Sequence, residues 1–369
     1  MKLLCILLFV SPLYVFSQNI TGIIQDSITN KYIEFAAVYI NGTTLGTVSD
    51  KNGNFSVPLQ RINFPCQIVI SHVSYCNKVI TINENSSLNL TISLSPKVVK
   101  LNQVTVVDRS LRKENIQHFK EIFLGRDDWG KNAILENDSV LIFNVEYYSN
   151  ADTCTPDLMG KPKIFRVKST TPLQIDLPLL GYNLRYDLVN FVEEYNTSMN
   201  TFFIHTLGYY FFKMKEAGSK TKENKYKRNR LKAYYYSPQH FTRSLYSQKL
   251  PENGYYVYEI VHSGEDNKIV VNKYIPDSCL LYTSDGAIIK GLKNHCFYIN
   301  YYSNFNDSPT NLSKTSFYDQ SKYSEIYFLH DTCVIRKDGT RPENSIVFGP
   351  GIGTKRVGAT LPNDYEPGK

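Results

Sequence analysis

The segment Gly46-Thr47-Val48-Ser49-Asp50-Lys51-Asn52-Gly53-Asn54-Phe55 decides the first fold assignment, because it reads as strand, tight turn and strand. Asp, Asn and Gly occupy the turn, and strand-forming residues flank it. Five further stretches of similar character surround this hairpin, at 19–26, 33–41, 67–71, 78–82 and 88–94. Seven short strands within about 75 residues predict a small antiparallel β-sandwich.

Several short motifs in and just after this unit form a recurring pattern. They are Ile20-Thr21-Gly22-Ile23-Ile24-Gln25-Asp26, Phe35-Ala36-Ala37-Val38-Tyr39-Ile40, Gly53-Asn54-Phe55, Ile70-Ser71-His72-Val73-Ser74-Tyr75 and Leu101-Asn102-Gln103-Val104-Thr105-Val106. Together they resemble the carboxypeptidase-like regulatory domain, a transthyretin-like sandwich, with the exit strand that follows it in bacterial envelope proteins. The resemblance implies a non-catalytic module. In that family the word carboxypeptidase refers to an enzyme domain that lies next to the module, not to an activity of the module itself.

The rest of the chain resembles a group of bacterial envelope proteins in which the regulatory domain is the only named part. The motifs that carry this resemblance include Leu180-Gly181-Tyr182-Asn183-Leu184, Asn229-Arg230-Leu231-Lys232-Ala233-Tyr234 and Lys355-Arg356-Val357-Gly358-Ala359-Thr360-Leu361-Pro362-Asn363-Asp364-Tyr365-Glu366-Pro367. Two departures are Ala133, where a cysteine is expected, and Tyr236, where a glycine is expected before Ser237. The resemblance implies an uncharacterised β-rich domain but no activity.

Composition supports this division. The chain has 369 residues, 42% of them hydrophobic and 20% charged, and a mean hydropathy of −0.30, which excludes wholesale disorder. A single domain rarely exceeds about 250–300 residues, so we expect two. The 28 tyrosines and 20 phenylalanines favour sheets over an all-helical bundle.

Residues 1–17 have the pattern of a secretory signal peptide. A short positive start precedes an apolar run over residues 3–16, which Pro12 interrupts. Val15 and Ser17 place acceptable side chains at positions −3 and −1 of a cleavage after Ser17. A membrane anchor needs about 20 uninterrupted apolar residues. We therefore expect export to the periplasm or the outer membrane, with no transmembrane span after signal removal.

The mature chain is then predicted to contain three parts. Residues 18–96 form the regulatory domain, 97–124 an exit strand and linker helix, and 125–369 a β-rich domain of unknown function. Apolar residues at helical spacing mark a helix over 108–124, and Ser237 followed by Pro238 marks a helix start. The predicted fold class is mainly β: a seven-stranded antiparallel β-sandwich plus a larger antiparallel sheet domain with a few helices.

Signal removal leaves six cysteines, an even number that permits disulfides in an exported chain. Cys66 and Cys76 flank a short strand and turn, so a disulfide between them is one interpretation. Buried thiols are the other. None of the cysteines has the spacing of a zinc site.

The clearest electrostatic feature is a basic segment over 213–232, which holds nine Lys or Arg and two Glu. Its net charge equals the +7 of the whole chain. An exported chain seldom meets nucleic acid, so we expect none as a partner. Contact with an anionic lipid or glycan surface is one interpretation, carried by Lys220, Lys222, Lys225 and Lys227. An ordinary solvated helix face is the other.

Three residues near the Ser237 helix start are candidate ligand-binding residues. Arg230, His240 and Arg243 either line a polar cleft or satisfy buried carbonyl groups, and the sequence favours the second role.

The strongest catalytic pattern is His118-Phe119-Lys120-Glu121, which matches the first half of a metallocarboxypeptidase zinc site. Chance alone supplies about 0.3 such matches in a chain of this composition, and helical geometry turns His118 and Glu121 away from the apolar face. We therefore expect a solvated pair, with no metal, no cofactor and no catalytic residue assigned.

The sequence as a whole predicts an exported, non-enzymatic binding or assembly protein of the cell envelope, with the sandwich as an adaptor. Its partner is an unknown envelope protein or an anionic surface. The alternative is an envelope hydrolase, a peptidase or a glycan-active enzyme, with its site in residues 125–369.

Overall fold

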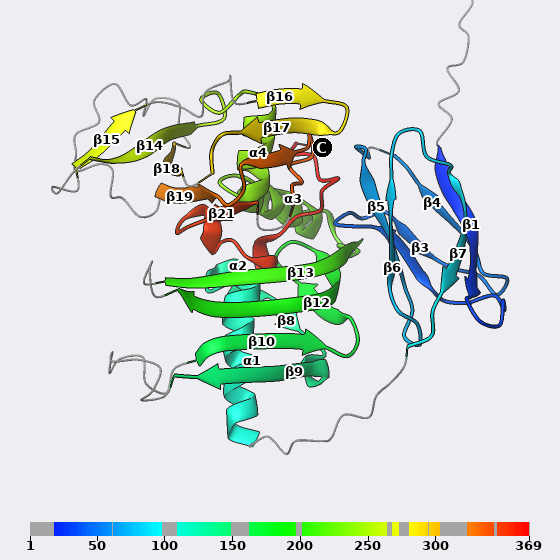
Figure 1. Ribbon diagram of the computed structural model, residues 1–369. Helices are drawn as coiled ribbons and strands as arrows, with labels where there is room; N and C mark the ends of the chain where they lie inside the picture. Colours follow the sequence, from blue (N-terminus) through cyan, green and yellow to red (C-terminus); the bar gives the residue numbers. More distant parts are fainter. Residues whose placement is uncertain are drawn as a thin grey trace, which may run out of the picture.

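The computed structural model describes residues 18–60, 62–97, 109–148, 162–196, 201–263, 268–272, 280–293, 295–302, 323–342 and 345–368. A β-sandwich lies beside a larger body of sheets and helices (Figure 1). The predicted signal peptide, the exit strand over 101–106, Cys154 and Cys279 lie outside the described residues.

The N-terminal unit has the seven predicted strands. They are β1 (Asn19–Asp26), β2 (Ala37–Ile40), β3 (Gly46–Val48), β4 (Asn54–Pro58), β5 (Cys66–Ser71), β6 (Lys78–Ile82) and β7 (Asn89–Leu94). They form two sheets, in the orders β4-β1-β7 and β3-β2-β5-β6. The prediction of a purely antiparallel sandwich is wrong in one pair, since β1 and β7 run parallel. The alternation of apolar and polar residues marks each strand, but it does not show which distant strand pairs with it or in which direction.

The sandwich core follows from the alternation of apolar residues along the strands. On β1 every second side chain is buried, including Ile20 and Ile24, each 0% exposed. The β5 residues Ile68 and Ile70 are equally buried. Successive side chains of a strand point to opposite faces, so each sheet presents one apolar face to the other.

The larger body begins with two helices and a six-stranded sheet. The helices are α1 (Arg109–Leu124) and α2 (Asp128–Asn132), and the strands are β8 (Ile134–Leu135), β9 (Leu141–Tyr147), β10 (Pro162–Ser169), β11 (Leu173–Leu177), β12 (Tyr182–Asn196) and β13 (Thr201–Met214). The sheet order is β8-β11-β12-β10-β9, with β13 paired to β12. All described pairs in this sheet are antiparallel.

A second layer of sheets follows two more helices, α3 (Lys220–Tyr234) and α4 (Pro238–Tyr246). The strands are β14 (Tyr255–Ser263), β15 (Lys268–Asn272), β16 (Leu280–Thr283), β17 (Gly286–Lys290), β18 (Cys296–Tyr301), β19 (Tyr323–Phe328), β20 (Thr332–Ile335) and β21 (Ile346–Phe348). They form one sheet in the order β15-β14-β18-β19-β21 and another in the order β16-β17-β20. The fold is therefore mainly β, as predicted.

The described residues of the larger body form two hydrophobic clusters. In one, α1 packs Phe119 and Phe123 against the six-stranded sheet, where both rings meet Phe191 of β12 edge-on. In the other, α4 packs Phe241 against the second layer. Helix α1, predicted as a linker, is therefore part of a core.

No helix of the described residues is both long and apolar enough to cross a membrane.

Candidate binding sites on helix α3 and at the domain junction

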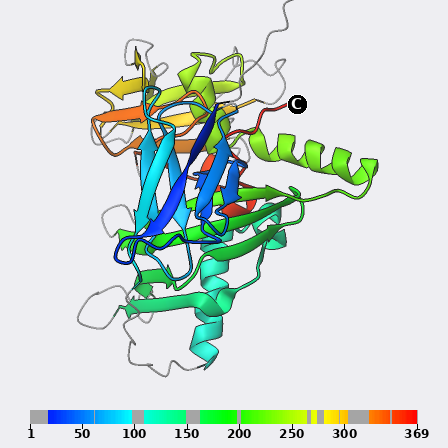
Figure 2. The ribbon, with the colours of Figure 1, turned by 90° about the vertical axis from the view of Figure 1, so that its right-hand side faces the viewer.

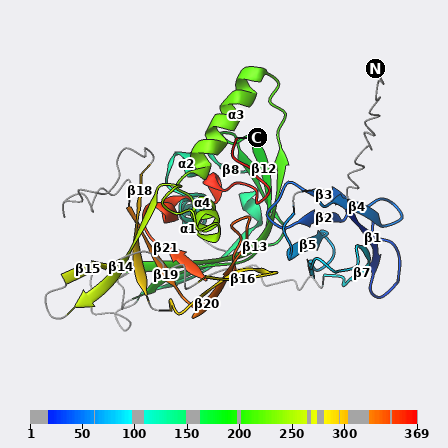
Figure 3. The same ribbon diagram turned by 90° about the horizontal axis from the view of Figure 1, so that it is seen from above.

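Helix α3 presents the basic segment to solvent. Its exposed cations are Lys220, Lys222, Lys225, Lys227, Arg228 and Lys232. The one acidic residue of the helix, Glu223, pairs with Lys220 and Lys227, with 3.1 Å between charged atoms in each case. Exposed ion pairs of this kind contribute little, so both lysines stay available to a partner. Figures 2 and 3 show α3 extending away from the rest of the molecule.

The inner end of α3 is fixed by Arg230, which is 9% exposed. Its Nε donates to the Leu180 carbonyl at 2.8 Å and its Nη2 to the Gly181 carbonyl at 3.3 Å. The guanidinium also lies 4.2 Å from the ring centroid of Tyr182. Arg230 therefore satisfies buried carbonyl groups, the role that the sequence favours.

His240 lies inside α4 and is 3% exposed. Its Nδ1 accepts from the backbone N–H of Tyr236 at 3.3 Å and lies 2.9 Å from the Tyr255 hydroxyl. Burial, with smaller contributions from Lys355 and Arg243, lowers the pKa of His240 to about 3. The imidazole is therefore neutral at pH 7, with its proton on Nε2.

Arg243 joins α4 to the C-terminal segment. Its three nitrogens donate to the carbonyls of Asp338, Tyr365 and Asn363, at 2.8, 2.9 and 2.8 Å. Arg230, His240 and Arg243 thus each bind groups of the protein itself. This geometry gives no support to a ligand role for them.

A buried carboxylate joins the two domains. Asp187 of β12 is 5% exposed, and it accepts from the Tyr39 hydroxyl at 2.7 Å and the Asn77 amide at 3.0 Å. The Arg185 Nε lies 3.1 Å away on the same strand. Ser71 Oγ lies 2.9 Å from the carboxylate and accepts from Arg185 at 2.8 Å. A buried charge with this many donors is compensated, and removing a partner is costly.

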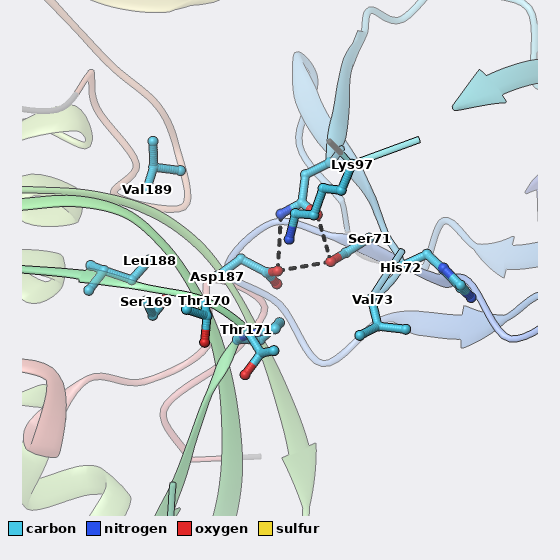
Figure 4. Close-up of a pocket in the computed structure, with 12 residues that line it drawn as sticks. Ser71, His72, Val73, Lys97, Ser169, Thr170, Thr171, Asp187, Leu188 and Val189 are labelled. Atoms are coloured by element: carbon cyan, nitrogen blue, oxygen red, sulfur yellow. Dashed lines mark hydrogen bonds between the residues drawn. The ribbon is translucent and has the colours of Figure 1, made fainter. Parts of the chain in front are cut away.

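The small cavity beside this carboxylate has a volume of about 70 Å³. Figure 4 shows Ser71 and Asp187 facing each other across the junction, with Lys97 and Thr170 nearby. That volume holds only a few water molecules. This cavity is too small for a substrate or cofactor.

Backbone bonds extend the junction along the edge strand β13. The N–H of Gly42 donates to Tyr210 at 2.7 Å, and the N–H of Phe212 donates to Thr43 at 3.0 Å. The Gly42 carbonyl accepts from Asn363 at 2.7 Å. A Cβ at Gly42 would lie 2.2 Å from the Asn363 side chain, and its φ of +75° favours glycine. The sandwich therefore pairs with part of the β13 edge, near Tyr210 and Phe212.

Comparison with protein families assigns the sandwich. The family described as CarboxypepD_reg-like domain matches residues 20–106. The chain carries a CarboxypepD_reg-like domain. The match covers the seven strands that pack as a sandwich, and a β-rich region follows it. No curated protein is similar enough to the chain to count as a match.

Solved structures add distant matches. One is a protein of unknown function from Bacteroides fragilis NCTC 9343, which is assigned to the membrane only provisionally. It is 12% identical, and the match covers 52% of this chain and 81% of that chain, with a TM-score of 0.18. Another is a 9R-lipoxygenase from Cyanothece PCC8801, 11% identical, with 63% of this chain but 48% of that chain covered and a TM-score of 0.19. TM-scores this low carry no argument about fold or function.

The structure corrects the expectation of a solvated His118–Glu121 pair. His118 Nε2 lies 2.6 Å from the Glu193 carboxylate of β12, whose side chain is 7% exposed. The His118 ring also packs on Phe165, with 4.8 Å between ring centroids. Glu121 bonds instead to Gln117 at 3.0 Å and Arg126 at 3.4 Å. Among the described residues, no group of three His, Cys, Asp or Glu is arranged to hold a metal ion.

Cys66 and Cys76 do not form the disulfide that the sequence allows. Both thiols of the CarboxypepD_reg-like domain are free, Cys66 buried and Cys76 exposed. In the β5–β6 hairpin, Cys66 pairs with Ile82, whereas Cys76 lies beyond the Ile70–Lys78 pair at the opposite end. Along the hairpin, Cys66 and Cys76 are therefore separated by about six residues of strand, or roughly 20 Å. A disulfide needs Cα atoms within about 7 Å, so these two cysteines are too far apart.

Sequence reasoning missed the acidic residues of β12 that organise this region. Asp187 and Glu193 are buried on a long strand rich in apolar and aromatic residues. An acidic residue between Tyr186 and Leu188 could have indicated a buried, paired carboxylate, because charges inside a protein are paired. Arg185 lies two residues away on the same strand, but the other partners, Tyr39, Ser71 and Asn77, come from another domain, so their identity was not predictable.

Proposed function

We propose that this chain is an exported cell-envelope protein that binds or assembles with other envelope components and catalyses no reaction. The CarboxypepD_reg-like domain acts as an adaptor, and helix α3 contacts an anionic glycan or lipid surface. The export part rests on the signal-peptide pattern of residues 1–17.

The geometry of α3 carries this proposal. The helix holds six exposed cations and one acidic residue and extends from the body, so it can approach a flat surface without obstruction (Figure 2). Its apolar residues Tyr226, Ala233 and Tyr234 are buried against the protein. We therefore expect electrostatic contact, at about 1 kcal/mol for each Lys or Arg near an anionic membrane, without insertion into it.

The junction supports the adaptor role. A domain held by the buried Asp187 and by backbone bonds to β13 moves with the larger body. A partner bound to the CarboxypepD_reg-like domain would thus be held at a fixed position relative to α3. Fixed geometry is what an assembly component requires.

The alternative is a hydrolase with its site in residues 125–369. It needs an acid and a base that converge on a substrate. The buried ionisable side chains Asp187, Glu193 and His240 instead bond to groups that stabilise the fold, which favours the binding proposal. Turnover of peptidoglycan fragments or of a denatured protein substrate by the purified chain would favour the hydrolase.

Fractionation of cells that make the protein tests the proposal. Lys220, Lys222, Lys225 and Lys227 are replaced together by Gln, and the control replaces the exposed lysines Lys31, Lys51, Lys168 and Lys249. We expect all three mature chains to begin at Gln18. The wild-type and control proteins should sediment with envelope membranes, and the α3 variant should become soluble. Retention of Met1, or equal sedimentation of all three proteins, would contradict the proposal.

A further inference from the structure

A larger cavity lies between the CarboxypepD_reg-like domain and the larger body, with a volume of about 700 Å³. Gln67 of β5 and Thr81 of β6 line it from the sandwich, and Tyr209 of β13 lines it from the larger body. The loop after β20 and the C-terminal segment complete it. Small-molecule sites commonly have this size and occur at domain interfaces.

The charged residues that line this cavity are all cations. They are Arg336, Arg341, Lys355 and Arg356, and none of the described lining residues is Asp or Glu. The nearby Asp338 does not line the cavity, and its Oδ1 is held by the backbone N–H and hydroxyl of Thr340, at 2.9 and 2.7 Å. The cavity is therefore an electropositive space.

One of the four cations has a structural role. Lys355 Nζ donates to the carbonyls of Lys232, Ala233 and Tyr235 at the end of α3. Burial lowers the pKa of Arg356, and the charge of Glu193 opposes this shift. Both cations add to the positive potential of the cavity.

The remaining cations are Arg336 and Arg341. Among the described residues, the buried Nε of Arg336 has no hydrogen-bond partner. Arg341 stacks 4.9 Å from the ring centroid of Phe348, and burial lowers its pKa. An unsatisfied buried donor costs free energy unless a ligand supplies the acceptor.

We propose that this cavity binds a small ligand that carries a phosphate or carboxylate group on a hydroxyl-bearing body, such as an anionic sugar. The planar forks of Arg336 and Arg341 suit the paired oxygens of such an anion. The uncharged polar lining, which includes Gln67, Gln239 and Asn363, suits hydroxyl groups. The site is separate from the exposed cations of α3, so it stands or falls independently of the surface contact.

Calorimetric titration of the full mature chain tests the site. The probes are glucose 6-phosphate, glucuronate, inorganic phosphate and glucose, each up to about 10 mM, a range that detects millimolar affinity. We expect saturable binding of at least one of the two charged sugars. Glucose should bind at least tenfold more weakly, because it lacks the anion. The preferred charged sugar distinguishes phosphate from carboxylate, and tighter binding than inorganic phosphate shows that the polar lining contributes.

Two variants locate the binding. Arg336→Gln and Arg341→Gln should each weaken binding by about tenfold or more, as for loss of a charge-assisted hydrogen bond. Lys249→Gln, at an exposed position after the end of α4, should leave binding unchanged. Without ligand, Arg336→Gln should not lower the thermal midpoint, because it removes an unsatisfied donor. This readout separates a binding residue from a structural one.

Three results would contradict the proposed site. The first is that neither charged sugar shows saturable binding. The second is that glucose binds as tightly as the charged sugars, and the third is that the wild-type protein and both folded arginine variants bind with equal affinity. A lower midpoint in ligand-free Arg336→Gln would assign that residue to the fold instead.

Discussion

Individual buried charges, more than any surface feature, connect distant parts of this chain. Asp187 binds the sandwich to β12, and Glu193 on the same strand binds α1 through His118. Each carboxylate lies on a strand, and each finds partners that are far away in sequence. Because a buried charge is stable only when it is compensated, these two positions should be the most sensitive polar sites of the molecule.

Asp187→Ala should lower the free energy of unfolding by about 3 kcal/mol, because it leaves the Arg185 Nε and the Tyr39 hydroxyl without their acceptor. Urea unfolding followed by circular dichroism measures this loss. The control, Glu252→Gln, changes an exposed carboxylate and should fall within about 0.5 kcal/mol of the wild type. If both variants unfold like the wild type, the junction does not depend on this carboxylate.

His118→Ala should destabilise the protein by about 1–3 kcal/mol, because it leaves the buried Glu193 carboxylate unsatisfied. Glu121→Ala should change stability by less than about 0.5 kcal/mol, since its partners are exposed. Chemical denaturation of both variants decides between this account and the solvated pair that the sequence predicts. Similar small effects in both variants would restore the sequence interpretation.

His240 predicts a pH dependence of stability. Its pKa is about 3 in the folded protein and about 6.5 when unfolded. Between these values the unfolded chain binds one more proton, so stability is lost as the pH falls through this window, by at most about 1.4 kcal/mol per pH unit. Urea unfolding at pH 7 and pH 5 should show a smaller loss in His240→Gln than in the wild type. Identical losses would mean that His240 does not titrate on unfolding.

At the scale of elements, local pattern predicted strands and helices well where each one carries its own signal. The seven strands of the sandwich and the helix over 109–124 lie within a few residues of their predicted positions. A short break at residues 170–172 separates β10 from β11. Elements are recognised from local periodicity, whereas their partners depend on long-range packing that periodicity does not encode.

Phe119→Ala tests whether α1 is a core element or a linker. Phe119 is fully buried, stacks on Phe123 at 4.8 Å between ring centroids, and meets Phe191 edge-on at 5.2 Å. Truncating it should cost about 3–5 kcal/mol, measured by urea unfolding, whereas Lys113→Ala on the exposed face should cost little. A loss below about 1 kcal/mol for Phe119→Ala would return α1 to the role of linker.

At the scale of the whole molecule, the excess positive charge is concentrated in one segment. The chain has 41 basic and 34 acidic residues, and the segment 213–232 accounts for its entire net charge of +7. The structure presents six of these cations on α3 and keeps Arg230 inside. The sequence predicted the basic surface because charge runs are visible in one dimension. The cavity of Arg336 and Arg341 was not predictable, because segments from both domains meet there.

Binding of the purified mature chain to vesicles tests the central proposal most directly. The vesicles are anionic or neutral, and the salt concentration rises from about 0.1 M, where the screening length is about 10 Å, to about 1 M, where it is about 3 Å. We predict binding to anionic vesicles only, loss of binding as salt rises, and loss in the variant with Lys220, Lys222, Lys225 and Lys227 replaced by Gln. The control with Lys31, Lys51, Lys168 and Lys249 replaced should still bind. Binding that is insensitive to salt, or equal in the two quadruple variants, would contradict an electrostatic contact through α3.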